Sequence, residues 1–245
     1  MKLELPLKTD IKIWQYFGNP NPVYNGLGIK GHNGIDFKAE HGTPIYASHD
    51  GMAFYEFDEH SGHGVTVTSN ETILYKGQQV NYKTIYWHMV DSAKEPQYTS
   101  PIEAKPMQVK TGDLIGYADN TGLSTGDHLH YGMKFMVNGQ NIEMDNGFKG
   151  ATDPFPFLPV LKYRFTSPME LGDHSDDVNH LQHYLYQHGY MDLVPYDQQG
   201  IYGNKTAKAV LRFQIDKIPS LSFYEKYILA GTRVGNKTLA VINQG

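Results

Sequence analysis

The 245-residue sequence contains no cysteine. This absence excludes disulfide bonds and thiolate metal sites, so any transition metal must be bound by imidazole and carboxylate groups. The chain has 12 histidines, which is enough for such a site.

The sequence also lacks an excess of positive charge and a long apolar segment. The formal net charge is -5, and because phosphate backbones attract basic surfaces, we expect no nucleic-acid partner. No apolar run approaches the roughly 20 residues that span a membrane. The N-terminal stretch MKLELPLKTDIK is charged throughout, whereas a signal peptide needs an apolar centre. We therefore expect neither a membrane span nor a signal peptide.

The length and the composition suit one medium domain followed by a small one, because 40% of the residues are hydrophobic and can form real cores. In residues 1–152, Gly, Asn and Asp separate short runs with period-two apolar patterns, which predicts a mainly β domain. Two of these runs, ETILY and VNYKTIYWHMV, predict a hairpin through KGQQ. Residues 153–168 are rich in proline and predict a linker.

Residues 169–245 change to a helical pattern. Ser175 and the two aspartates after it can cap a helix, and Gly189 can end it. Between them, Val178, Leu181 and Leu185 form one apolar stripe. The tetrapeptide GNKT occurs twice, at residues 203–206 and 235–238, and each copy predicts a helix start. The chain is thus expected to be an α+β multidomain protein with a small helical second domain.

The stretch GHNGID is a first candidate for a metal site. The glycines disfavour a helix, so His32 is expected in a loop and Asp36 on a strand. With Ile35 and Phe37 facing the core, alternation places Asp36 on the opposite face, where the loop can meet it. A histidine and an aspartate near glycines more often cap a turn, so this stretch alone leaves both interpretations open.

Further histidines lie on predicted strands. His128 and His130 are separated by one residue, so both imidazoles should leave the same face. In TIYWHMV, alternation places His88 on the same face as Tyr86. The alternative for His128 and His130 is an exposed strand face, and the alternative for His88 is a half-buried structural histidine. Together, however, these stretches favour a metal site in a cysteine-free chain.

Six other histidines are interpreted as parts of the fold and not as metal ligands. Four of them lie in turn-like neighbourhoods and complete no ligand set: His41, His49, His60 and His63. His180 and His183 are close enough on the second-domain helix to share a metal, but a solvated helix face is the favoured interpretation.

The stretches GHNGIDF, YWHM and VKTGDLIGYADNTGLSTGDHLHYGM together resemble the M23 family of zinc metallopeptidases, of the lysostaphin type. The resemblance implies an antiparallel β-sheet groove in which His32, Asp36 and His130 bind Zn²⁺. It also implies that His88 and His128 are catalytic, and that the substrate is the peptide cross-links of bacterial peptidoglycan. A catalytic zinc ion uses three protein ligands and keeps a position for water, which agrees with this division.

The sequence contains no H-E-x-x-H helix, so the glutamate base of other zinc peptidases is absent. The two catalytic histidines are the available replacements, because imidazole titrates nearest neutrality. The sequence does not decide which of them acts as the base and which stabilises the oxyanion.

The second domain, in the stretches LGDHSDDVNHLQHYLYQHGYMD, GIYGNKTAKAVLRFQ and GTRVGNKTLAVIN, is similar to the small three-helix peptidoglycan-binding domain of cell-wall hydrolases. An insert at residues 215–230 is not explained by this similarity. The similarity implies an enzyme that lyses the cell wall and is held on it by this domain.

The expected place of action is outside the cytoplasm, for a phage lysin or a mature secreted enzyme. The alternatives are a catalytically inactive M23-like scaffold and a wall-binding virion protein with an architectural zinc ion. The bond cut, the host and the oligomeric state are not predicted.

Overall fold

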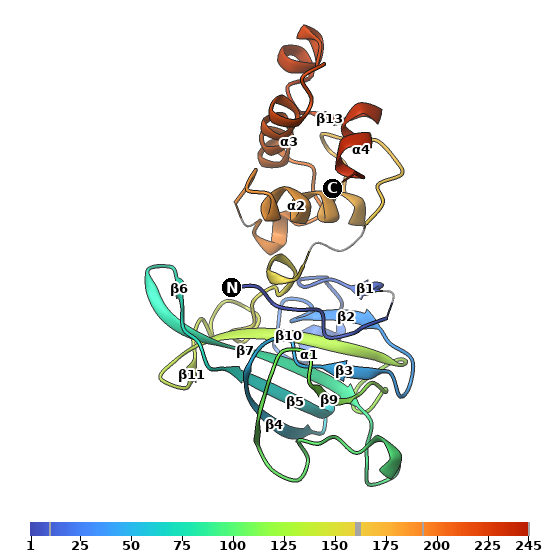
Figure 1. The fold of residues 1–245 in the computed structure, drawn as a ribbon, viewed down its shortest axis with the longest axis vertical. Coiled ribbons are helices and arrows are strands. Elements are labelled where there is room, and N and C mark those ends of the chain that lie inside the picture. Colours follow the sequence, from blue (N-terminus) through green and yellow to red (C-terminus); the bar gives the residue numbers. More distant parts are fainter. Residues whose placement is uncertain (10, 160–162, 193, 245) are drawn as a thin grey trace. The chain divides into compact units, whose positions relative to one another are not determined.

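The computed structural model describes residues 1–9, 11–159, 163–192 and 194–244. The chain forms two compact units, Met1–Pro159 and Val160–Gly245 (Figure 1). Their division falls within the predicted linker, of which residues 160–162 lie outside the described residues. The exact domain limits at residues 152 and 169 stay predictions.

The first unit is built on a sheet whose paired strands are all antiparallel, which confirms the predicted fold class. The main order is β1-β2-β10-β7-β5-β4-β8, while β11 pairs with β10, β6 with β7, and β3 with β9 in a separate pair. The strands are β1 (Ile13–Gln15), β2 (Ile35–Lys38), β3 (Pro44–Tyr46), β4 (Gly51–Asp58), β5 (Gly62–Ser69), β6 (Ile73–Tyr75), β7 (Gln78–Met89), β8 (Met107–Val109), β9 (Leu114–Tyr117), β10 (His128–Val137) and β11 (Gln140–Asn141).

Strand β10 lies between β2 and β7 and carries the alternation on which the site depends (Figure 1). Leu129 and Tyr131 are fully buried, and they pair with Phe37 and Ile35 of β2. Burying each such side chain stabilises the fold by roughly 1.5–3 kcal/mol. One face of β2 and β10 is therefore fixed in the core, and the other face is left for polar groups.

The predicted hairpin is confirmed, with a shorter turn than expected. Tyr75 of β6 pairs with Gln78 of β7, so only Lys76 and Gly77 connect the strands. Both residues have positive φ values, 48° and 81°. Two consecutive positive φ values are typical of the type I′ turn, whose twist matches that of the flanking strands.

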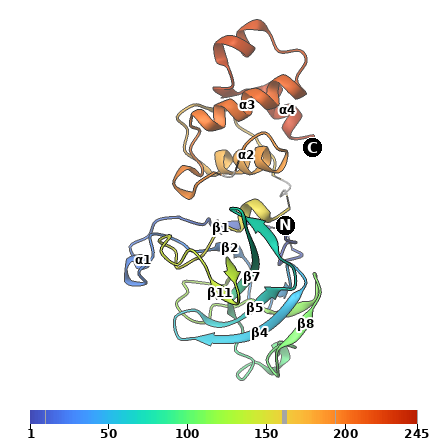
Figure 2. The ribbon, with the colours of Figure 1, turned by 90° about the vertical axis from the view of Figure 1, so that its left-hand side faces the viewer.

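Three short helical segments lie outside the sheet of the first unit. They are α1 (Val23–Gly26), η1 (Pro96–Tyr98) and η2 (Phe155–Phe157). Figure 2 shows α1 beyond the edge of the strands, in the chain that leads into β2. The irregular segments at residues 19–28 and 92–106 contain α1 and η1.

The second unit is a small helical domain, as predicted. Its elements are β12 (Met169–Glu170), α2 (Asp176–Gln187), η3 (Tyr196–Gln198), α3 (Asn204–Lys217), the π-helix η4 (Tyr224–Leu229), β13 (Arg233–Val234) and α4 (Asn236–Ile242). Ser175 caps α2 by accepting a hydrogen bond from the Val178 N–H, and Gly189 follows the helix at φ 76°. Each GNKT copy starts a helix, because α3 and α4 both begin at its asparagine.

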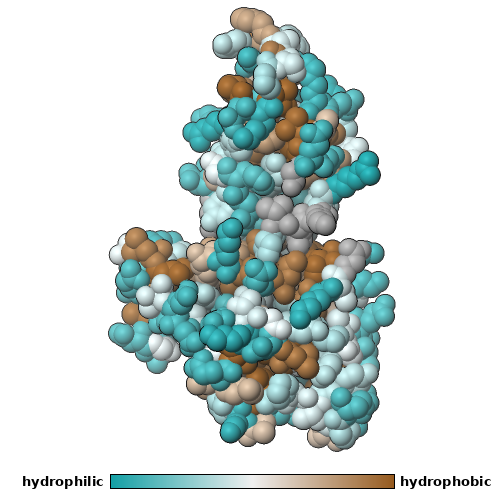
Figure 3. All heavy atoms as spheres, in the orientation of Figure 1, coloured by the Kyte–Doolittle hydropathy of each residue, from teal (hydrophilic) through white to brown (hydrophobic). Residues whose placement is uncertain are grey.

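Some large apolar side chains are exposed at the surface, although most are buried in the cores. Figure 3 shows hydrophilic side chains interspersed with apolar ones over the face it draws. The most exposed large apolar side chains of the predicted insert are Phe223, Tyr224, Tyr227 and Ile228. Among the helices of the described ranges, none has both the length and the hydropathy for crossing a membrane.

The predicted solvated position of His180 and His183 is wrong. His183 is 5% exposed, and the His180 ring stacks on Tyr163 with centroids 3.7 Å apart. The helical pattern of α2 did not indicate the position of His180, because its partner Tyr163 precedes the helix by several residues. Burial lowers the pKa of His180 to about 4.

This lowered pKa predicts acid sensitivity of the second unit. The unfolded chain takes up the His180 proton near pH 6.5 and the folded chain only near pH 4, so stability is present above pH 6.5 and falls as the pH drops through this window. The loss is roughly 1.4 kcal/mol per unit of pKa difference. Hydrogen exchange of the α2 amides should accelerate at pH 5, and His180→Phe should flatten this dependence. An identical pH dependence in both proteins would contradict the prediction.

Candidate functional site

The register between β2 and β10, together with the loop before β2, brings three of the predicted site residues together. Asp36 pairs directly with His130, on the face opposite the buried Ile35 and Phe37. His32 lies in the loop before β2 and is held by backbone hydrogen bonds with Gly18 and Asn19. The expected placement of His32 in a loop and Asp36 on a strand is therefore what the structure contains.

The three side chains converge on one point. The Nε2 atom of His32 lies 2.9 Å from Nδ1 of His130 and 3.0 Å from Oδ1 of Asp36. The third distance, from Nδ1 of His130 to Oδ1 of Asp36, is 3.1 Å. All three residues are at most 9% exposed.

This triad, His32, Asp36 and His130, fits a metal ion. Nδ1 of His32 lies 3.2 Å from the backbone oxygen of Tyr16, which only accepts, so this nitrogen carries the proton and Nε2 of a neutral ring presents a lone pair. Ligand atoms held about 2.0–2.1 Å from one tetrahedral zinc ion lie about 3.3 Å apart, close to the observed separations. Two imidazoles and a carboxylate are also ligand types that zinc accepts.

The charge of Asp36 is stabilised by its neighbours. Burial by itself raises the pKa of the Asp36 carboxyl, but the close imidazole rings of His130 and His32 outweigh burial and hold the pKa well below its ordinary value. Burial lowers the pKa of His130. These two shifts favour an ionised Asp36 beside a neutral His130, and metal binding requires this protonation state.

Gly34 makes room for this arrangement. A Cβ atom at this position would lie 2.7 Å from two ring atoms of His130 and from the Tyr131 oxygen. Any larger residue in GHNGID at this position would displace the His130 ring.

The other two predicted residues, His88 and His128, lie beside the triad. Their ring centroids are 4.6 Å apart, and Nε2 of His128 is 3.7 Å from Oδ1 of Asp36. Nδ1 of each ring donates to a backbone oxygen at 2.7 Å, that of Thr121 for His88 and that of Gly126 for His128. These bonds fix the tautomers, so Nε2 is the nitrogen that remains available in each ring.

The prediction that His88 shares a face with Tyr86 is wrong. Tyr86 packs against Tyr131 in the core, whereas His88 lies with His128 on the site side. The reason is a φ of 64° at His88, which interrupts the pleat at the end of β7. A positive φ in a residue other than glycine is costly, and such conformations concentrate at functional sites. Burial, reinforced by the nearby His130, lowers the pKa of His88 to about 4.

Tyr24 was not identified from the sequence. Its ring stacks on His32 with centroids 5.8 Å apart. Burial, together with the charge of Asp36, raises the pKa of Tyr24 to about 12. The phenol therefore keeps its proton at neutral pH and is a hydrogen-bond donor beside the triad. The sequence of the irregular stretch around Tyr24 did not single out this residue.

His41 was assigned to a turn, and the structure places it in a hydrogen-bond network behind the site. Nδ1 of His41 is 2.9 Å from Asp119, and its backbone N–H donates to Asp127. These two aspartates bound the loop of residues 119–127, which supplies the carbonyl oxygens that hold both His88 and His128. His41 thus anchors both ends of the loop that orients these two histidines.

The same imidazole also contacts a second carboxylate. Nε2 of His41 is 3.1 Å from Glu95. The hydrogen bond to Asp119, partly offset by burial, and the bond to Glu95 raise the pKa of His41. Because its two ring nitrogens face different carboxylates, a protonated imidazole explains this cluster without a metal.

Two further histidines, His49 and His63, form hydrogen-bond contacts away from the triad. His49 is buried, and its ring is 3.0 Å from the hydroxyl of Thr84. His63 lies on β5, where its ring contacts the Tyr55 hydroxyl.

The fold and the triad define an antiparallel β domain with a candidate metal site, followed by a helical domain. Residues 30–144 match peptidase family M23, and residues 174–217 match the peptidoglycan binding domain family. The first unit therefore contains an M23 peptidase domain, and the second contains a peptidoglycan-binding domain. Both resemblances in the sequence are confirmed.

Curated relatives share the M23 region. An uncharacterized metalloprotease of Haemophilus influenzae is 33% identical over 138 residues, which are 56% of this chain and 25% of that protein. Glycyl-glycine endopeptidase ALE-1 of Staphylococcus capitis is 32% identical over 142 residues, 56% of this chain and 32% of that protein. The chain thus covers a quarter to a third of the length of these two relatives.

Solved structures give similar matches. The catalytic domain of the antimicrobial peptidase lysostaphin from Staphylococcus simulans is 26% identical, with a TM-score of 0.43. The match covers 60% of this chain and 91% of that chain.

The network around His41 predicts a loss of peptidase turnover in His41→Ala. Without this anchor, the loop of residues 119–127 no longer holds His88 and His128 in one orientation, so kcat should fall about tenfold while bound metal is unchanged. Steady-state kinetics and elemental analysis measure the two quantities. His60→Ala, an exposed histidine that enters the network through its backbone only, is the control. Equal kcat values for His41→Ala and the wild type would contradict the role of His41.

Proposed function

We propose that the first unit is a zinc-dependent endopeptidase that hydrolyses the peptide cross-links of bacterial peptidoglycan. The observation that carries this proposal is the buried triad of His32, Asp36 and His130, with two oriented histidines beside it. The names of relatives support the substrate class, since they include peptidoglycan DD-endopeptidase ShyC of Vibrio cholerae and a glycyl-glycine endopeptidase.

The triad would hold the zinc ion, with Nε2 of His32, a carboxylate oxygen of Asp36 and Nδ1 of His130 as ligands. A bound zinc ion supplies Lewis-acid activation of a water molecule and of the scissile carbonyl group. The hydrogen bond between His32 and the Tyr16 oxygen orients the ring, as outer contacts of metal-binding histidines commonly do.

His88 and His128 would move protons. In each ring Nδ1 is occupied by a backbone carbonyl, so Nε2 can accept a proton from the attacking water and return one to the leaving amine. The carbonyl acceptors of Thr121 and Gly126 also stabilise the imidazolium that forms, because they accept the hydrogen bond in either protonation state.

Tyr24 would bind the developing oxyanion. Its phenol is protonated at neutral pH and lies against His32. A donor fixed in a partly buried site stabilises developing negative charge more than water does.

The second unit would hold the enzyme on its substrate. A wall-binding domain that is tethered to a peptidase raises the local concentration of cross-links without contacting the scissile bond. This unit is proposed to contribute to activity on intact walls and not on soluble peptides.

The division of roles predicts two classes of variant. His130→Ala should lose both metal and turnover, whereas His88→Ala and His128→Ala should retain the metal and lose turnover by about 10²–10⁴-fold, the usual contribution of acid–base catalysis. Elemental analysis gives the metal content, and hydrolysis of a soluble cross-linked peptide gives the rate. Retained turnover in both His88→Ala and His128→Ala would exclude the proposed proton transfer.

Metal removal tests the activity itself. Purified peptidoglycan treated with the protein should release new amino termini, a chelator should abolish the release, and added zinc should restore it. Mass spectrometry of the fragments then identifies the bond that is cut. Walls that bind the zinc-loaded protein but stay intact would instead indicate a catalytically inactive scaffold.

A further inference from the structure

The second unit contains the same local arrangement twice. The Gln182 side chain donates to the Ile201 oxygen at 2.9 Å and lies 3.0 Å from the Thr206 hydroxyl. Gln214 repeats both contacts, at 2.9 Å to the Arg233 oxygen and 2.9 Å to the Thr238 hydroxyl. The sequence separations are also equal, with 19 positions to the carbonyl and 24 to the threonine in each copy. The repeated GNKT therefore marks two copies of one structural unit inside the domain.

In the second copy, the lysine of GNKT binds a carboxylate of the chain itself. Nζ of Lys237 lies 3.0 Å from Oε2 of Glu225. Glu225 belongs to the insert of residues 215–230, which the sequence similarity left unexplained, and Ser222 also donates to it from its backbone N–H and its hydroxyl. The insert thus supplies a fixed anion to this copy.

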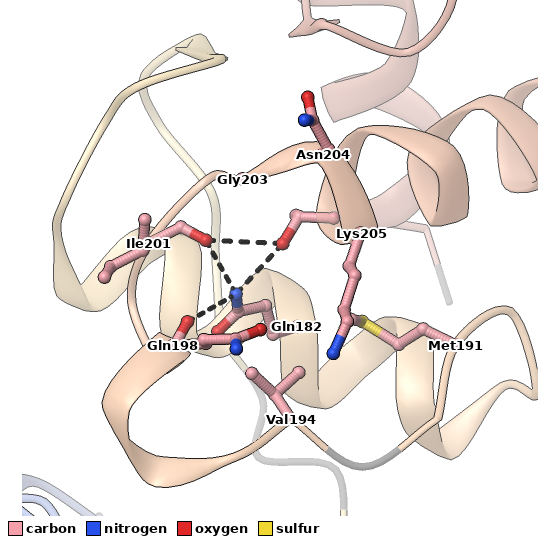
Figure 4. Close-up of a pocket in the computed structure, with 9 residues that line it drawn as sticks. Gln182, Met191, Val194, Gln198, Ile201, Gly203, Asn204 and Lys205 are labelled. Carbon is pink, nitrogen blue, oxygen red and sulfur yellow. Dashed lines mark hydrogen bonds between the residues drawn. The ribbon is translucent and has the colours of Figure 1, made fainter.

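In the first copy, the equivalent lysine borders an open pocket of about 250 Å³. Figure 4 shows the Lys205 side chain extending past Met191 towards Val194, while the Gln182 contacts close the pocket on the other side. Among the residues that the structure describes, no carboxylate forms an ion pair with Lys205. The pocket is lined by Gln182, Met191, Val194, Gln198, Ile201, Gly203, Asn204, Lys205 and Thr206.

The pocket combines one cationic group with apolar walls. Lys205 offers an ammonium group, as Lys237 does, and Met191, Val194 and Ile201 offer apolar walls. The volume of about 250 Å³ is slightly below the usual range for small-molecule sites, so one or two small residues would fill it. A free carboxylate with adjacent methyl groups combines both features, and the alanine-rich stem peptides of peptidoglycan carry such groups.

From the duplicated lysine and the open pocket, we infer that the first copy binds the carboxylate end of a peptidoglycan stem peptide, with Lys205 in the role that Lys237 has towards Glu225. This inference rests on the proposed wall-binding function of the second unit. All lining residues lie within the matched peptidoglycan-binding region, residues 174–217.

Binding of the full-length protein to purified peptidoglycan tests this site. The assay contains a chelator, so that the walls stay intact. Lys205→Glu should weaken binding at least about tenfold, because it places like charges together. Lys208→Glu is the matched control, since Lys208 is an exposed lysine of the same helix outside the pocket, and it should bind as the wild type does. Hydrolysis of a soluble cross-linked peptide should be unchanged in both variants.

The ligand group is tested with two probes, N-acetyl-D-alanyl-D-alanine and its C-terminal amide. The free acid should shift the NMR signals of Lys205 and Met191 at millimolar concentration, and the amide should not. Equal shifts with both probes, or no shift with either, would overturn the assignment of the carboxylate to Lys205.

The outcomes separate this inference from the proposed function. If Lys205→Glu binds walls as well as the wild type does, the pocket is not the site, although the second unit still binds walls. If the wild type does not bind walls at all, the wall-binding function fails, and the inference fails with it. Neither result changes the assignment of peptidase activity, which the soluble peptide reports independently.

Discussion

The rest of the first unit depends on one constraint, the burial of the Asp36 carboxylate. A buried charge is costly unless it is paired and hydrogen-bonded. Here two imidazoles meet it at 3.0 and 3.1 Å, and a bound cation would complete the compensation. The pairing of β2 with β10 sets the position of His130, and the loop before β2 sets that of His32. A shift of this register by one residue would turn Asp36 into the apolar core, so the site and the sheet are specified together.

The two histidines beside the triad depend on a different element. Their orientation comes from the loop of residues 119–127, which has little regular structure of its own but is fixed at several points. The Asp119 N–H donates to the His88 oxygen, and the His128 N–H donates to the Asp119 oxygen. The side chain of Asp119 meets His41, which comes from the turn after β2. The proposed ligands are thus placed by strand register, whereas the proposed proton-transfer groups are placed by a loop that a distant histidine anchors.

This difference explains how much of the site could be predicted from the sequence. Strand alternation indicated the common face of His128 and His130 and the opposite face of Ile35, because these residues lie in regular strands. Alternation failed at His88, where a positive φ breaks the pleat, since no local pattern in TIYWHMV indicates that conformation. His41 and Tyr24 could not be found in this way, because their importance comes from contacts with residues far away in the sequence. The grouping of all five predicted residues relied on the family resemblance.

In the second unit, the insert distinguishes the two copies of the repeated hydrogen-bond arrangement. A carboxylate that is tethered next to a lysine has an effective concentration that a dissolved ligand rarely matches. Glu225 therefore competes with any external anion at Lys237, and its bonds from Ser222 keep it in place. The first copy has η3 and a short loop at the equivalent position, which leave Lys205 beside a pocket. The insert thus gives Lys237 a fixed carboxylate partner, whereas Lys205 borders a pocket, so the two copies differ in the surroundings of the repeated lysine.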